Sequence, residues 1–134
     1  MAKYVKDLEG AFDEVLELFN RTDYETLASK MDPDIITKRV LNPGSIVGIG
    51  NVKAYLIGRM KPLEPRMLNL SDVTFYPSDQ AARANAMNGQ VSGIAEYYDK
   101  GGGPPTRVRF IWTFARKNNT EDWSLINAFA APIG

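Results

Sequence analysis

The sequence predicts an α+β fold, in which helices from the first half of the chain cover one face of a curved antiparallel sheet. Apolar residues recur at helical spacing before Pro62, whereas strand patterns dominate after Leu68. Two runs near the C-terminus, 107–116 and 123–132, flank a polar turn and form a hairpin with a large aromatic face. That face needs cover, and only the first half of the chain can supply it.

The composition suits one folded domain of residues 1–134 and excludes several kinds of site. Of the 134 residues, 44% are hydrophobic and 24% charged, and the sixteen basic and sixteen acidic side chains balance. Zero net charge argues against nucleic-acid binding and favours self-association. The chain contains no His and no Cys, which excludes a histidine base, a histidine metal ligand, a Ser-His-Asp triad and a thiolate. We expect neither a cofactor nor a metal.

The sequence shows no signal for membrane insertion or export. Residues 1–12 carry charges where a signal peptide has its apolar core, and no apolar run approaches the length of a membrane span. We therefore expect a cytoplasmic protein with no membrane partner.

Two helices are predicted at the start of the chain. Apolar residues at helical spacing indicate an amphipathic helix over 3–20. Thr22 or Asp23 can cap a second helix that runs to about Lys30. Pro33 stops this second helix.

The next segment is predicted to contain one strand and a third helix. The β-branched run 35–41 indicates a strand, and a turn is expected at 42–45. The third helix is predicted over 52–59. Pro62 and Pro65 then mark a linker.

The second half is predicted to be four consecutive strands. The first covers about 68–76, and the second is one long strand over 81–98, bent or bulged at Gly89 or Gly93. The Ala-rich start of this second run also fits a helix. A flexible loop at 99–105 leads into the terminal hairpin.

The first hairpin strand has two unlike faces, one with Val108, Phe110, Trp112 and Phe114 and the other with Arg107, Arg109, Ile111 and Thr113. We expect the aromatic face inside, because burial of Phe and Trp stabilises the fold more than burial of the face that carries the arginines. The arginines then lie on the outer face or in a dimer contact. If the other face lined the cavity, Arg109 could clamp a ligand carboxylate. The second hairpin strand is predicted to be buried on both faces.

Three segments together resemble the nuclear transport factor 2-like (NTF2-like) superfamily, in its branch of SnoaL-like cyclases and ketosteroid isomerase-like proteins. They are FNRTDYETLASKMDPD, NPGSIVGIGNVKAYL and the ending W-x-L-x-N after a polar turn. The resemblance covers nearly the whole chain as an order of elements. It implies a cone-shaped, cystatin-like α+β barrel, an apolar pocket between helices and sheet, and frequently a homodimer.

The catalytic groups of these relatives are not found at the matching positions. The oxyanion-hole tyrosine of ketosteroid isomerase falls on Val15, its general base falls near Arg39, and the strand 108–114 has no acid. The Asp–His arrangement of the cyclases needs a histidine. The Asp-Arg-Asp set of limonene epoxide hydrolase-like members is matched only in part by Glu96 and Arg109, at a different spacing.

Glu96 and Tyr98 are the candidate catalytic residues. A carboxylate at a pocket wall can have its pKa raised by desolvation and act as an acid or base, and a nearby tyrosine can donate to an oxyanion. The alternative is that Glu96 faces solvent or pairs with Arg107 or Arg109 across strands.

Tyr55, Arg109, Trp112 and Asn127 are the candidate substrate-binding residues. Asn127 interrupts an apolar strand and needs a partner, which is either a ligand or an internal hydrogen bond. Tyr55 and Trp112 fit the pocket rim and also fit the core.

Two functions remain open. The first is a binding protein, or a cofactor-independent isomerase, cyclase or hydrolase, for a small apolar or carboxylate-bearing molecule held between helices and sheet. The second is a non-catalytic dimerisation or ligand-sensing module.

Overall fold

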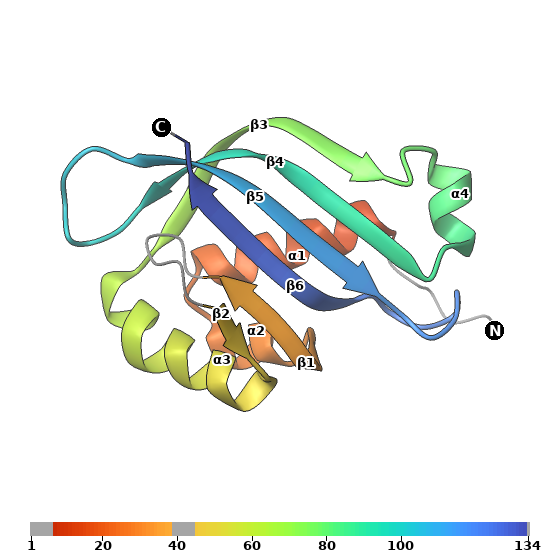
Figure 1. The fold of residues 1–134 in the computed structure, drawn as a ribbon, viewed down its shortest axis with the longest axis horizontal. Helices are drawn as coiled ribbons and strands as arrows, with labels where there is room; N and C mark the ends of the chain where they lie inside the picture. Colours follow the sequence, from red (N-terminus) through yellow and green to blue (C-terminus); the bar gives the residue numbers. More distant parts are fainter. Residues whose placement is uncertain (1–6, 39–44, 134) are drawn as a thin grey trace.

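The computed structural model describes residues 7–38 and 45–133. Its first three helices lie against a six-stranded sheet in the order β2-β1-β6-β5-β4-β3, and a fourth lies in the connection between β3 and β4 (Figure 1). Four consecutive strands form the predicted antiparallel meander, namely β3 (Arg66–Tyr76), β4 (Asn88–Tyr98), β5 (Thr106–Ala115) and β6 (Ser124–Pro132). The predicted α+β class is confirmed.

The early strand makes the sheet mixed and not purely antiparallel. β1 (Met31–Lys38) pairs parallel with β6 and antiparallel with the short β2 (Ser45–Val47), which the sequence did not predict. β1 begins before the expected start at residue 35. Its register with β6 shifts between Met31 and Ile36, where Pro33 removes a backbone donor. The predicted strand residues 39–41 and most of the predicted turn lie outside the described residues.

The first two helices agree with the prediction. α1 (Leu8–Asn20) is followed by α2 (Tyr24–Ala28), and the Asp23 carboxylate accepts a hydrogen bond from the Thr26 amide at 3.3 Å. The Asn20 side chain fixes the end of α1 to β3. Its amide donates to the carbonyl of Met67 at 3.0 Å, and its oxygen accepts from the amide of Met67 at 2.8 Å. The predicted helix residues 3–6 lie outside the described residues.

The third helix begins earlier and ends later than predicted. α3 (Ile49–Tyr55) continues directly into a π-turn, η1 (Leu56–Met60), and a 3-10 turn, η2 (Lys61–Leu63). The predicted linker at Pro62 therefore lies partly within helical structure, where Pro is tolerated in the first turn.

The start of the predicted long strand is a helix, α4 (Gln80–Asn85). The Asp79 carboxylate accepts from the amide of Ala81 at 2.9 Å and so caps the helix, and the Ala-rich run has high helix propensity. The alternative interpretation of this run is confirmed, and strand structure begins only at Asn88.

The prediction of a bulge at Gly89 or Gly93 is wrong, because the irregularities lie on the neighbouring strand β3. β4 pairs with β5 without any register shift from Asn88 to Tyr97. The shifts fall on β3, where Asn69 and Asp72 have φ of 53° and 52°. Gly93 serves packing, because a Cβ at that position would meet the Phe110 ring at 3.0 Å.

The core lies between α1 and the inner face of the meander. Phe12 of α1 packs on Phe110 with ring centroids 5.8 Å apart and meets Phe75 edge-on at 5.9 Å. Phe110 and Phe114 are fully buried, so the predicted inward direction of the aromatic face is confirmed. On β6, however, Phe129 is 37% exposed, and the expectation that this strand is buried on both faces is wrong.

Candidate functional site

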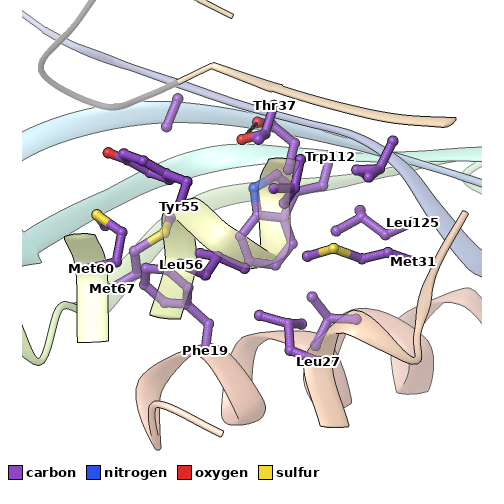
Figure 2. Close-up of a pocket in the computed structure, with 15 residues that line it drawn as sticks. Phe19, Leu27, Met31, Thr37, Tyr55, Leu56, Met60, Met67, Trp112 and Leu125 are labelled. Atoms are coloured by element: carbon purple, nitrogen blue, oxygen red, sulfur yellow. Dashed lines mark hydrogen bonds between the residues drawn. The ribbon is translucent and has the colours of Figure 1, made fainter. Parts of the chain in front are cut away.

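A cavity of about 90 Å³ lies between the helices and the inner face of the sheet. The helical segments α1, α2, α3 and η1 form one wall, and strands β1, β3, β5 and β6 form the other (Figure 2). The lining consists of Val15, Phe19, Leu27, Met31, Ile35, Thr37, Val52, Tyr55, Leu56, Met60, Met67, Trp112, Leu125, Ala128 and Ala130.

The lining is almost entirely apolar. Its polar side-chain atoms belong to Thr37, Tyr55 and Trp112, and the Thr37 hydroxyl already donates to the carbonyl of Ala128 at 2.8 Å. No residue in this lining is an Asp, Glu, Lys or Arg. Within the described ranges 7–38 and 45–133, the structure therefore provides a small hydrophobic compartment with few polar anchors.

Two of the predicted substrate-binding residues lie in the lining. Trp112 contributes from β5, and Tyr55 contributes from the last turn of α3, with its hydroxyl directed away from Trp112 (Figure 2). The structure thus brings both to the cavity. Their role in binding stays a prediction.

The other two predicted substrate-binding residues do not line the cavity. Arg109 is exposed and pairs in register with Ile94 and Ala131, on the face opposite Phe110. Asn127 follows the register shift in β6, so it lies beside Thr113 while its neighbour Ala128 lines the cavity. The structure separates these two residues from Tyr55 and Trp112.

Glu96 and Tyr98 also lie on the outer face. Strand alternation places them opposite the buried Ala95 and Tyr97. The Glu96 carboxylate accepts from the Tyr98 hydroxyl at 2.5 Å and from the Asn69 amide at 3.2 Å. Neither residue lines the cavity.

The hydrogen bond from Tyr98, followed by that from Asn69, lowers the pKa of Glu96. The expectation of a raised pKa is therefore wrong, because Glu96 is hydrogen-bonded at the surface and not desolvated in the cavity. The same hydrogen bond to Glu96 raises the pKa of Tyr98. A catalytic role for the pair stays a prediction.

Sequence patterns missed a polar cluster beside the cavity, formed by Tyr24, Tyr55, Arg66 and Tyr97. The hydroxyl of Tyr24 and the Nη1 atom of Arg66 are buried and have no hydrogen-bond partner among the described residues. Burial is the largest cause that raises the pKa of Tyr24, and it raises the pKa of Tyr97 to about 12. Tyr24 lies on the buried side of α2, and no spacing in the sequence links it to Arg66.

A second, polar cleft of about 230 Å³ lies where α4 meets the hairpin turn. Arg83 is buried there and pairs with Asp7, with 3.2 Å between Arg83 Nη2 and Asp7 Oδ2. Burial alone would raise the pKa of Asp7, but the hydrogen bond from Arg83 and further contacts lower it. Arg83 also donates to the carbonyls of Pro77 and Ser78, each at 3.0 Å. These bonds tie α4 to the rest of the fold.

The described residues give no sign of a metal site or a membrane helix. No group of three or more Asp or Glu side chains in 7–38 and 45–133 could hold a metal ion. Within the same ranges, no helix is long and apolar enough to cross a membrane.

Comparison with known proteins identifies the fold. No protein-family model matches the sequence, and no curated protein matches it significantly. Among solved structures, a candidate dehydratase of the NTF2-like family from Streptomyces avermitilis is 20% identical, with a TM-score of 0.75 over 96% of this chain and 94% of that one.

Two further structures support the same assignment. A ketosteroid isomerase-like protein from Erwinia carotovora atroseptica is 16% identical, with a TM-score of 0.69 over 95% of this chain and 94% of that one. An NTF2-like protein with a cystatin-like fold from Novosphingobium aromaticivorans is 15% identical, with a TM-score of 0.68 over 95% of this chain and 80% of that one. The chain therefore has the NTF2-like, cystatin-like fold that its order of elements resembles.

Proposed function

We propose that this protein binds a small, largely apolar molecule in the cavity between its helices and its sheet. The observation that carries the proposal is the cavity itself, which interrupts an otherwise well-packed core and is lined by apolar side chains. The structural neighbours named as a candidate dehydratase and as ketosteroid isomerase-like are consistent with a small-molecule site in this fold.

The size of the cavity limits the part of the ligand that it encloses. An engineered cavity of about 150 Å³ binds benzene, and the cavity here is about 90 Å³. A ring-sized occupant must therefore displace a lining side chain. Met31, Met60 and Met67 are suited to this, because unbranched methionine side chains adapt readily.

Binding is proposed here and not catalysis, because the described lining offers little acid–base chemistry. Tyr55 is the only residue in this described lining whose side chain is ionisable. A cofactor-independent isomerase, cyclase or hydrolase working in this cavity would have to use Tyr55, or recruit Glu96 and Tyr98 from the other face of the sheet.

Toluene is a suitable first probe. We expect saturable changes in Trp112 fluorescence when toluene is added to a Trp123→Phe variant, in which Trp112 is the only remaining indole. Ala130→Leu fills the cavity and should abolish the change, whereas Ala54→Leu, on the exposed side of α3, should not. Equal responses from the two alanine variants would contradict the proposal. Native mass spectrometry of freshly purified protein would reveal a molecule that is already bound.

We also propose that the outer face of the sheet pairs with a second copy of the chain. Ile111 and Phe129 are cross-strand neighbours and are each 37% exposed. Glu96 and Arg107 pair in register on the same face, so it carries both signs of charge and can oppose a two-fold-related copy. Zero net charge also favours association.

Light scattering tests this pairing. We expect a homodimer for the wild type and a monomer for the double variant Ile111→Glu/Phe129→Glu. Val47→Glu, which changes an exposed residue on the edge strand β2, is the matched control and should stay dimeric. A wild type that is monomeric at high micromolar concentration contradicts the pairing.

A further inference from the structure

Two buried polar groups without partners among the described residues lie beside the cavity, although neither belongs to its lining. The Tyr24 side chain is 1% exposed, and its hydroxyl has no hydrogen-bond partner among the described residues. The Nη1 atom of Arg66 is also buried without a partner. None of the ion pairs between described residues involves Arg66.

The two groups are near one another and near two more tyrosines. Arg66 lies within electrostatic range of the Tyr24 hydroxyl, as do Tyr97 and Tyr55. The Tyr24 hydroxyl and Arg66 Nη1 are not hydrogen-bonded to each other. Each thus remains available for a third group.

The neighbours of the cluster connect it to the cavity. The ring of Tyr24 lies 6.2 Å from the ring of Phe19, which lines the cavity. Tyr97 pairs in register with Met67, another lining residue. Tyr55, which also lines the cavity, lies within electrostatic range of the Tyr24 hydroxyl. Figure 2 shows Phe19, Met67 and Tyr55 gathered toward one end of the cavity, on the side away from Leu125.

The chemistry of the pair indicates which kind of group it can bind. A guanidinium N–H can only donate, and a tyrosine hydroxyl can donate when it meets an acceptor. Buried polar groups are normally hydrogen-bonded, because leaving them unpaired costs stability. The positive charge of Arg66 favours an acceptor that is an anion.

We propose that Tyr24 and Arg66 bind the carboxylate of a ligand whose apolar body occupies the cavity. This inference rests on the proposed binding function and specifies its ligand class as small monocarboxylic acids with a hydrophobic tail. The carboxylate has two oxygens, so it can accept from the Tyr24 hydroxyl and from Arg66 Nη1 together. Tyr55 and Tyr97 then border the head group.

A comparison of acids with a neutral probe tests the inference. Benzoate, phenylacetate and 3-phenylpropionate place a carboxylate at increasing distance from the ring, and toluene lacks the carboxylate. Dissociation constants are measured for each by NMR titration of the intact protein. We expect at least one acid to bind roughly tenfold or more tightly than toluene, as charge-assisted hydrogen bonds predict.

Five variants locate the head group. Arg66→Gln and Tyr24→Phe should each weaken the best acid by roughly tenfold and leave toluene unchanged. Arg109→Gln and Tyr76→Phe, which change the same residue types at exposed positions, should leave both ligands unchanged. Arg66→Lys should restore part of the affinity for the acid. Thermal unfolding confirms that each variant is folded.

The possible outcomes are distinct. If toluene binds but no acid binds more tightly, the carboxylate inference is overturned and the binding proposal stands. If Arg109→Gln abolishes acid binding and Arg66→Gln does not, the site is on the other face and the inference is wrong. If neither toluene nor any acid binds, the binding proposal fails, and the inference fails with it.

Discussion

The two faces of the central strands β4 and β5 carry different kinds of side chain. The inner face holds Val91, Phe110 and Phe114, all fully buried beneath α1. The outer face holds the hydrogen-bonded Glu96, together with Arg109 and the half-exposed Ile111. The charged side chains of these two strands therefore lie on the outer face, and the cavity lies against the inner face. The difference shows that conspicuous ionisable residues need not lie at the cavity.

The largest expected difference between the faces is in the cost of truncating a phenylalanine. Phe110→Ala removes a fully buried ring and should lower the free energy of unfolding by about 3–5 kcal/mol. Phe129→Ala removes a ring that is 37% exposed and should cost less than half as much. Urea denaturation at low protein concentration measures both values. Equal losses would contradict the assignment of the two faces.

A smaller difference is expected for adding or removing one small group. Gly93→Ala places a Cβ against the Phe110 ring at 3.0 Å and should destabilise the fold by about 1–3 kcal/mol. Ser92→Ala, at the next position and on the other face, should be nearly neutral. The midpoint of chemical denaturation reports both. A neutral Gly93→Ala would show that the inner face tolerates repacking at this point.

Tyrosines on the two faces should respond in opposite directions. Tyr24→Phe removes a buried hydroxyl that has no partner in the described chain and should raise the free energy of unfolding by up to about 1 kcal/mol. Tyr98→Phe removes the donor to Glu96 and should slightly lower the melting temperature. If Tyr24→Phe is clearly less stable than the wild type, its hydroxyl is already satisfied in the free protein.

The smallest effect concerns the charge of Glu96. Its folded-state pKa is lowered, so the stability contributed by its ionised form is present above the ordinary pKa of about 4.3 and is lost as pH falls through the folded value. Glu96→Gln should therefore slightly lower the melting temperature at pH 7 and have no effect in strong acid. A higher melting temperature at pH 7 would mean that Glu96 is desolvated after all.

Local patterns were sufficient to predict the sheet and its inner face. Alternation between Phe110 and Arg109 determined which face is buried, because strand side chains point to opposite sides. The same reasoning was weaker at 81–85, which was predicted as strand. Ala and Arg favour a helix there, and the Asp79 cap stabilises the helix. The β3 bulges at Asn69 and Asp72 left no signal that could be separated from an ordinary polar strand.

The candidate site was predictable only in part. Tyr55 and Trp112 were expected at the pocket, and both line it. Glu96 was selected because it is a carboxylate near an aromatic hairpin, but the alternation of β4 directs it outward. Tyr24 and Arg66 come within electrostatic range of each other in a fold whose α1 end is fixed to β3 through Asn20, a tertiary contact that sequence spacing does not encode.

The irregular path of β3 has a consequence for aggregation. β3 is an edge strand, and an evenly paired edge would present a row of free amides and carbonyls to any other unfolded or folded chain. The two register shifts and the left-handed residues Asn69 and Asp72 interrupt that row. The opposite edge, β2, spans only three residues. Neither edge is a good template for fibril growth, so the architecture disfavours open-ended strand addition.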